Sequence, residues 1–224
     1  EKSKVLVQEL QGFSVDQLGK LMKISPKLSE LNQKRFQDFS FPFTSKNALM
    51  AIYMFAGDTY VGLDAGSLKD KDIDYAQDHL GILSGMFGLL RPKDLVQPYR
   101  LEMGTSLKVK DSRNLYSFWK NSIAGLIDFE KHTYIVNCAS KEYFLSIEPH
   151  IDKKKIVTPI FKQRKGDVYK VISFSAKRAR GAFARFVITN RITEIQQLHH
   201  FTYDGYVYKE TEESEGTNLL FIKE

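Results

Sequence analysis

The chain has 224 residues, of which 42% are hydrophobic and 27% are charged, and its sixteen Phe and eleven Tyr supply enough apolar surface for a sizeable core. This composition excludes a disordered chain and a fibrous repeat. The net charge of +6 is concentrated: residues 153–191 hold twelve Lys or Arg and one acidic residue, Asp167, whereas residues 192–224 hold two basic and seven acidic residues. Because the positive charge is concentrated in one short segment, it implies a polyanionic partner.

The single cysteine, Cys138, excludes an intramolecular disulfide, and the five histidines have no zinc-site spacing. We therefore expect a cytoplasmic protein with no metal and no cofactor. Apolar runs such as residues 81–90 are far shorter than the roughly 18 residues that a membrane span needs, so no membrane partner is expected, and nothing implies an obligate protein partner. The chain begins at Glu1 without a methionine, and we interpret it as truncated at the N-terminus.

In the N-terminal half, the hydrophobic spacing predicts two helices around a tight corner. Ser14 can cap a helix over residues 14–23, and Pro26 can begin a second helix with Leu28 and Leu31 on its inner side. Further elements are predicted from periodicity and turn residues: a helix near 45–55, turns at Gly57–Asp58 and at Gly62, a helix over 70–80, and a buried strand and turn over 81–90.

The C-terminal half mixes helices with β-forming segments. The predicted elements are a helix over 114–129, a core strand over 133–138, a hairpin of 156–161 with 168–174, a helix over 176–189, and two strands around an acidic loop within 203–222. Hairpins and helices without a clear βαβ series predict an α+β or mixed α/β fold. We expect a single domain over residues 1–224, with a mixed sheet and flanking helices.

The basic hairpin and helix over residues 153–191 form the strongest candidate binding segment. One face of the helix is apolar, which leaves the cations on the other side. Gly181 and Ala184 stand among these cations, where small residues would let a phosphate backbone approach closely. The candidate DNA-binding cations here are Lys177, Arg178, Arg180 and Arg185. The alternative is a solvated basic face that binds nothing, although no acidic residue occurs between Asp167 and Glu194.

The corner within residues 14–32 is similar to the helix-hairpin-helix motif, which holds the phosphates of one DNA strand through backbone amides. Leu21, Ile24, Pro26 and Lys27 match that motif in register. Where the motif has its two glycines, this chain has Lys23 and Ser25. We therefore expect their side chains to contact the phosphates, in place of the close approach of backbone amides that glycines allow. Lys23, Ser25 and Lys27 are therefore candidate phosphate ligands, and a plain pair of antiparallel helices is the alternative.

A third candidate is the proline-stiffened loop over residues 84–104, which is rich in ionisable groups. A catalytic interpretation would use Asp94 or Glu102 as a base and the arginines to bind an anionic substrate. The structural interpretation is a salt-bridged crossover. The possible cleft residues are Ser84, Arg91, Asp94, Tyr99, Arg100 and Glu102.

Four segments of the chain resemble, in the same order, the YaaA peroxide-stress-resistance family of bacterial proteins: FAGDTYVGL, LSGMFGLLRPKDLVQPYRLEMG, NCASKEYF and ISFSAKRARGAFARFVITNR. Two features depart from the family. Its N-terminal hydrophobic strand and following Ser-Pro-Ala-Lys-type loop are absent before Glu1, and Arg178 replaces the second of two paired lysines while keeping the charge.

The resemblance implies a cytoplasmic protein on a family-specific fold that protects cells from hydrogen peroxide by limiting unincorporated iron and DNA damage. It also implies DNA binding through a positively charged cleft and a helix-hairpin-helix element. The leading hypothesis is thus a protein that binds the backbone of duplex or distorted DNA with little sequence preference. The alternative is an enzyme that acts on a nucleotide or nucleic-acid base in the same cleft.

Overall fold

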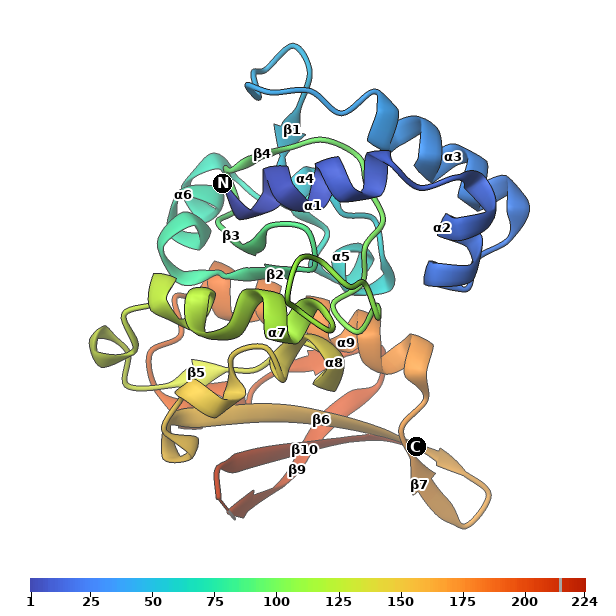
Figure 1. The fold of residues 1–224 in the computed structure, drawn as a ribbon. Helices are drawn as coiled ribbons and strands as arrows, with labels where there is room; N and C mark the ends of the chain where they lie inside the picture. Colours follow the sequence, from blue (N-terminus) through green and yellow to red (C-terminus); the bar gives the residue numbers. More distant parts are fainter. Residues whose placement is uncertain (214) are drawn as a thin grey trace. The chain divides into compact units, whose positions relative to one another are not determined.

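The computed structural model describes residues 1–213 and 215–224, which group into two compact units (Figure 1). Unit 1 comprises Glu1–Met54, Gly81–Ile127 and Ser140–His150. Unit 2 comprises Phe55–Leu80, Asp128–Ala139 and Ile151–Glu224. The predicted acidic loop includes Ser214, which lies outside the described residues.

Unit 1 is mainly helical and contains two small antiparallel pairs of strands, β1 with β4 and β2 with β3. Its elements are α1 (Lys2–Gln11), α2 (Val15–Met22), α3 (Pro26–Gln37), β1 (Leu49–Met50), α4 (Ala51–Met54), β2 (Ile82–Ser84), β3 (Gly88–Leu90), β4 (Leu95–Val96), α7 (Leu115–Trp119), η2 (Lys120–Ser122), η3 (Ala124–Leu126), α8 (Lys141–Phe144) and η5 (Glu148–His150).

Unit 2 is built around a six-stranded mixed sheet. Its elements are α5 (Asp58–Leu63), η1 (Ala65–Ser67), α6 (Asp70–His79), η4 (Phe129–Lys131), β5 (Ile135–Val136), η6 (Lys153–Lys155), β6 (Ile156–Lys165), β7 (Val168–Lys170), α9 (Ser173–Asn190), α10 (Ile195–Leu198), β8 (Thr202–Tyr203), β9 (Tyr206–Glu213) and β10 (Thr217–Lys223).

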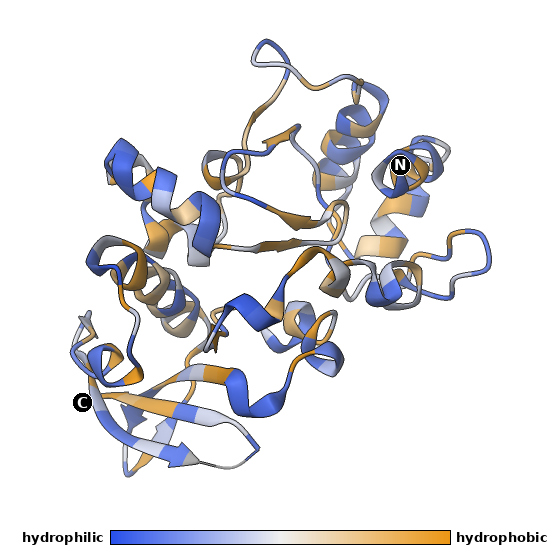
Figure 2. Ribbon diagram, turned by 90° about the vertical axis from the view of Figure 1, so that its left-hand side faces the viewer, coloured by the Kyte–Doolittle hydropathy of each residue, from blue (hydrophilic) through white to orange (hydrophobic). Residues whose placement is uncertain are grey.

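The sheet has the order β5-β6-β10-β9-β8, and β7 pairs with β6 as a hairpin. Strand β6 pairs in parallel with β5 and β10, while the other pairs are antiparallel. Both apolar and polar residues occur along these strands (Figure 2), as expected for a sheet with one covered face. The mixed sheet with flanking helices confirms the predicted mixed α/β fold class.

The core of unit 2 is aromatic. Phe161 of β6 and Phe221 of β10 lie opposite each other in register, and their rings stack with centroids 5.3 Å apart. Phe183 of α9 packs edge-on against Phe161 at 6.2 Å, which fixes α9 on the sheet. Each such buried ring stabilises the fold by about 2–3 kcal/mol. The predicted apolar face of α9 is confirmed, since Ala176, Ala179 and Phe183 are buried.

The predicted helices at residues 14–23, 70–80 and 176–189 and the hairpin around Gly166 are confirmed. Ser14 caps α2 with a capping box: its hydroxyl accepts from the Gln17 amide at 3.3 Å, and the Gln17 side chain accepts from the Ser14 amide at 2.8 Å. Pro26 is the first residue of α3, as predicted. Helix α1 is not among the predicted elements.

The predicted inner side of α3 is wrong. Leu28 and Leu31 are 39% and 44% exposed, whereas Ser29, Asn32 and Phe36 are buried. The polar members of this buried face satisfy themselves within the helix, because Ser29 donates to the Ser25 carbonyl at 3.0 Å and Asn32 donates to the Leu28 carbonyl at 2.8 Å.

Two further predictions in the N-terminal half need correction. Residues 58–63 form α5, whose cap is Gly57, so no turn occurs at Gly62. Only Ala51–Met54 of the predicted 45–55 helix is helical, because Leu49–Met50 extends to pair with β4. The expected strand and turn over 81–90 is present as the β2–β3 hairpin.

Three predictions in the C-terminal half are also too long. The helix predicted over 114–129 ends as α7 at Trp119, because Lys120 has a positive φ of 47°, and short 3₁₀ turns follow. The core strand predicted over 133–138 is the two-residue, half-buried strand β5 at the sheet edge. Strand β7 ends at Lys170, since α9 already begins at Ser173.

Candidate nucleic-acid interface

The corner between α2 and α3 has the backbone conformation that a glycine would adopt. Lys23 ends α2 in the left-handed region, with φ 53° and ψ 50°, at the position where the sequence lacks the first motif glycine. The next amide, of Ile24, donates to the Gly19 carbonyl at 3.2 Å. A lysine therefore occupies the turn position, and its side chain is exposed there.

Close packing of α2 against α3 forms the corner. A Cβ added to Gly19 would lie 2.9 Å from the Ser29 hydroxyl, so two small residues let the helices approach. The corner brings Lys23, Ser25 and Lys27 together within five residues, and all three are exposed.

The N-terminus of α3 carries unused donors. Ser25 is the N-cap in an extended conformation, but its side chain makes no capping hydrogen bond. The first amides of a helix have no intrahelical partner and carry the positive end of the helix dipole; in α3 these donors are the amides of Lys27 and Leu28, because Pro26 has no N–H. An exposed, uncapped N-terminus beside two lysines is therefore suited to a phosphate.

Three arginines in and directly after α9 have aspartate partners in the segment that precedes and includes α6. Arg178 Nε lies 3.6 Å from Asp58 Oδ1, Arg185 Nη1 lies 3.8 Å from Asp64 Oδ2, and Arg191 Nη2 lies 2.8 Å from Asp72 Oδ1. Arg178 and Arg185 lie within α9, and Arg191 is its C-cap. Sequence analysis did not identify the aspartates, although six of them fall within residues 58–78, which is a detectable charge signal opposite to that of α9.

The four candidate cations of α9 thus differ in environment. Lys177 is exposed and has no ion pair among the described residues. Arg178 also stacks on the ring of Phe174, with Cζ 4.1 Å from the ring centroid. Arg185 donates to the carbonyls of Leu63 at 3.1 Å and Asp64 at 2.7 Å, at the C-terminus of α5.

Arg180 and Cys138 occupy the same partly buried environment. Arg180 Nε donates to the Ala176 carbonyl at 3.3 Å, and burial lowers the pKa of its guanidinium. Burial raises the pKa of the Cys138 thiol to about 12, despite the opposing effect of the Arg180 charge. Cys138 is therefore a thiol at neutral pH, in a position where it packs against the core of unit 2.

The expected close approach of phosphate at Gly181 is not available. A Cβ at Gly181 would lie 1.7 Å from the carbonyl oxygen of Thr59, so α5 already fills the space that the missing side chain leaves. Ala184 is half-buried. The small residues of α9 serve helix packing at Gly181 rather than an open groove.

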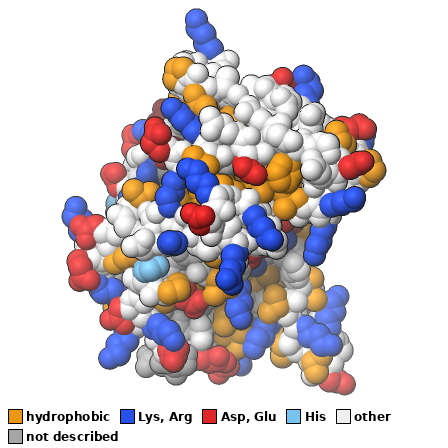
Figure 3. Space-filling view, in the orientation of Figure 1, with side chains coloured by type: hydrophobic (Ala, Val, Ile, Leu, Met, Phe, Trp, Pro, Cys, Tyr) orange, Lys and Arg blue, Asp and Glu red, His pale blue; other side chains and the backbone are white. Residues whose placement is uncertain are grey.

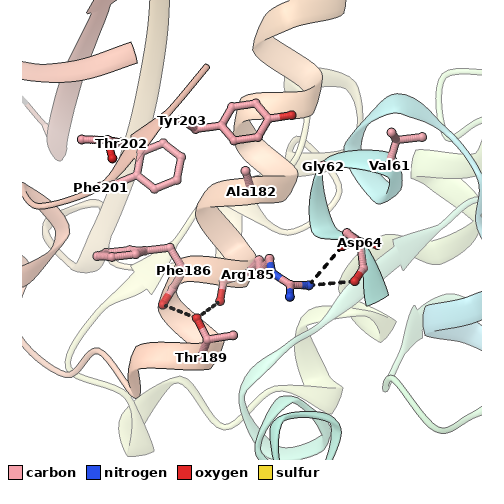
Figure 4. Close-up of a pocket in the computed structure, with 10 residues that line it drawn as sticks. All are labelled: Val61, Gly62, Asp64, Ala182, Arg185, Phe186, Thr189, Phe201, Thr202 and Tyr203. Atoms are coloured by element: carbon pink, nitrogen blue, oxygen red, sulfur yellow. Dashed lines mark hydrogen bonds and ion pairs between the residues drawn. The ribbon is translucent and has the colours of Figure 1, made fainter. Parts of the chain in front are cut away.

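A surface pocket of about 520 Å³ opens between α5, α9 and β8 (Figure 4). Phe186, Phe201 and Tyr203 supply aromatic surface on one side, and Arg185 points across to Asp64 on the other. The guanidinium is already held by backbone carbonyls, so it fixes the pocket wall.

The six cleft candidates of the loop fall into three local pairs within unit 1. The buried Ser84 hydroxyl lies 2.5 Å from the Tyr99 hydroxyl and also accepts from the Phe87 amide at 2.9 Å. The Asp94 carboxylate accepts from the Arg91 amide at 2.7 Å, which closes a turn. Arg100 Nη2 pairs with Glu102 Oε1 at 2.6 Å. These contacts agree with the salt-bridged crossover.

Two features of the described residues concern membranes and metals. Within residues 1–213 and 215–224, no helix is both long and apolar enough to span a membrane. Over the same residues, no three His, Cys, Asp or Glu side chains are grouped so that they could hold a metal ion.

The sequence matches one protein-family model and is similar to several bacterial proteins. A family model described as peroxide stress protein YaaA matches residues 1–212. A UPF0246 protein of Aliivibrio fischeri strain MJ11 is 47% identical over 223 residues, which cover 98% of this chain and 86% of that protein. UPF0246 proteins of Saccharophagus degradans and Pseudoalteromonas translucida are 44% and 45% identical, over 100% of this chain and 88% of each relative.

Proposed function

The chain belongs to the peroxide stress protein YaaA family, and from this premise we propose that it protects DNA during peroxide stress by binding the phosphate backbone. The observation that carries the proposal is the α2–α3 corner. There an uncapped helix N-terminus, a left-handed Lys23, and exposed Ser25 and Lys27 lie within five residues. Backbone amides and lysines recognise phosphate and do not read bases, so sequence preference is small.

The segment 153–191 supplies a second basic surface in unit 2. Of the α9 cations, Lys177 is the one to which we assign a phosphate contact, since Arg178 and Arg185 have intramolecular partners and Arg180 is half-buried. On the β6–β7 hairpin, Lys165 is also exposed. Long-range attraction between this charge and DNA raises the rate of association and weakens with salt.

The cytoplasmic location and the limitation of unincorporated iron are parts of the proposal that rest on the family resemblance. No grouped ligand set in the described part of the chain supports iron binding. We therefore place the iron effect downstream of DNA protection in this proposal and assign it no residues.

An enzyme acting on a nucleotide or base is the alternative that the loop residues suggest. It needs a carboxylate that is free to act as a base. Asp94 accepts from a backbone amide and Glu102 is paired with Arg100, so both carboxylates already have partners. We therefore favour DNA binding.

The deciding experiment measures binding to a labelled duplex by fluorescence polarisation between about 50 and 200 mM salt. Wild type is compared with Lys23→Gln/Lys27→Gln and with the matched control Lys34→Gln/Lys46→Gln, which removes the same charge from exposed positions of unit 1. The corner variant should bind more weakly and lose about two units of salt slope. Equal binding by both double variants would reject the corner as the phosphate site.

A further inference from the structure

The segment Val168–Phe174 exposes four large apolar side chains. Val168 is 48%, Tyr169 41%, Val171 56% and Phe174 52% exposed. The segment runs from β7 to the start of α9. Other residues of α9, such as Ala176 and Phe183, pack into the core. Large apolar side chains that stay exposed within one short segment make it a candidate binding surface. We call this segment the hairpin patch.

The ring of Phe174 is oriented by a neighbouring arginine. The Arg178 guanidinium lies 4.1 Å from the centre of its ring, and Asp58 lies 3.6 Å from Nε of that guanidinium. Asp58 thus holds Arg178, and Arg178 orients the ring of Phe174, while Phe174 as a whole residue stays 52% exposed. A ring that is ordered before binding loses little conformational entropy when it stacks on a ligand.

The surroundings of the patch are mainly cationic. Lys165, Lys170 and Lys177 are exposed within the same stretch of chain, and blue and orange side chains gather over the β7 region in Figure 3. Two carboxylates are also present: Asp167 lies at the hairpin turn, and Glu224 accepts from Arg164 and from the Tyr169 hydroxyl. The balance of charge favours a polyanion that also offers flat apolar surface.

We propose that the hairpin patch binds unpaired bases of DNA, with Phe174 as the stacking residue and Lys170 and Lys177 on the flanking phosphates. This inference rests on the proposed function and adds the class of DNA that the protein prefers. Within a duplex the faces of the bases are covered by their neighbours, so only an unpaired base can stack on a protein ring. Stacking is tolerant of sequence because every base has a π face.

The test compares a labelled single-stranded oligonucleotide with the duplex of the same sequence, using the full chain. Phe174→Ala should weaken single-strand binding at least about fivefold, while duplex affinity changes less than about twofold. Phe174→Leu keeps the apolar bulk without the ring and should lose as much as Phe174→Ala. Phe174→Trp should keep the affinity, and its fluorescence should be quenched by the single strand. Leu126→Ala, at a 62% exposed site in unit 1, is the matched control.

Each contrary result has a distinct meaning. Duplex binding with no loss of single-strand affinity in Phe174→Ala would overturn the stacking inference and leave the proposed function standing. Parallel losses on both DNAs would also overturn it, because the patch would then act on the backbone alone. If wild type binds neither DNA, the inference and the proposed function both fail. A patch that mediates self-association would appear as a Phe174-dependent dimer in ultracentrifugation with unchanged single-strand binding, which rejects the inference.

Discussion

Gly181 of α9 and Thr59 of α5 are in backbone contact: a Cβ added at Gly181 would lie 1.7 Å from the Thr59 carbonyl oxygen. The contact is reciprocal, because a Cβ at Gly62 of α5 would lie 1.9 Å from the carbonyl oxygen of Arg178. Two glycines thus allow α5 and α9 to cross with no side chain between them. This crossing positions the acidic segment beside the α9 arginines.

Gly181→Ala should therefore destabilise the protein, although alanine normally gains about 1 kcal/mol over glycine inside a helix. The neighbouring atoms are backbone and have little room to move, so we expect a net cost of about 3 kcal/mol or more and a melting temperature lower by roughly 6–12 °C. Calorimetry measures this. Gly66→Ala is the control, since nothing lies within 4 Å of its added Cβ, and it should melt like wild type.

The Arg191–Asp72 pair predicts a pH-dependent stability. Burial by itself would raise the pKa of Asp72, but hydrogen bonds from Arg191 and the Lys69 amide outweigh it and lower the pKa. A carboxylate with a lowered pKa stabilises the fold above its unfolded pKa of about 3.9, and this stabilisation is lost as pH falls through the folded pKa.

Asp72→Asn should thus unfold at lower urea concentration than wild type between about pH 5 and pH 8, and the gap should close below about pH 4. Asp78→Asn, at an exposed position on the same helix, should show a small difference at every pH. A gap for Asp72→Asn that persists unchanged to the acid limit would mean that packing, rather than the ion pair, explains the loss.

Sequence periodicity predicted α2 and α9 well: Ser14 caps α2, and α9 buries Ala176, Ala179 and Phe183. It failed where a tertiary contact decides the local structure. The sequence predicts a turn at Gly62, yet this position is a glycine because the α9 backbone passes against it. The apolar side chain of Leu31 predicts that it is buried, but it is exposed. Ser29 is buried instead, because its small side chain lets α2 approach. Neither contact has a signature within its own segment.

The candidate site shows the same limit. Clustered charge correctly singled out α9 as basic, and register singled out the corner at Lys23. Sequence did not show that Arg178, Arg185 and Arg191 each have an aspartate partner, because these pairs join residues more than 110 positions apart. Only the fold separates paired arginines from an exposed cation such as Lys177.

Cys138 should react very slowly with thiol reagents and peroxide in the native protein. Its pKa of about 12, against about 8.5 for a free cysteine, reduces the reactive thiolate on the order of a thousandfold near neutral pH. Alkylation followed by mass spectrometry should show slow labelling of the native chain and rapid labelling in urea. Labelling of native protein as fast as free cysteine would contradict the burial seen here.

Lys23 allows charge and backbone strain to be separated. A non-glycine residue at φ 53° costs about 1 kcal/mol, so Lys23→Gly should be at least as stable as Lys23→Ala, by up to about 1 kcal/mol in urea unfolding. Both variants remove the same charge and should lower duplex affinity equally, each reducing the salt slope by about 1. If the more stable of the two variants bound duplex more tightly, the corner would act through its conformation alone.

The last prediction separates binding cations from structural ones on α9. Lys177 is exposed, whereas Arg185 holds the carbonyls of Leu63 and Asp64. Lys177→Gln should therefore weaken duplex binding and reduce the salt slope while leaving the melting temperature unchanged. Arg185→Gln should cost about 1–3 kcal/mol of stability, because two carbonyls lose a charged donor, with little change in affinity well below the melting temperature.

The two variants remove the same charge from the same helix, so each controls for the other. A loss of affinity that is equal in both, at equal folded fraction, would mean that DNA competes successfully with the α5 carbonyls for Arg185. The Arg–Asp pairs would then be broken on binding, and Asp64→Asn should bind duplex more tightly than wild type because it removes a nearby negative charge. Unequal losses in the predicted direction would instead establish that the pairs stay closed and that exposure decides which α9 cations contact phosphate.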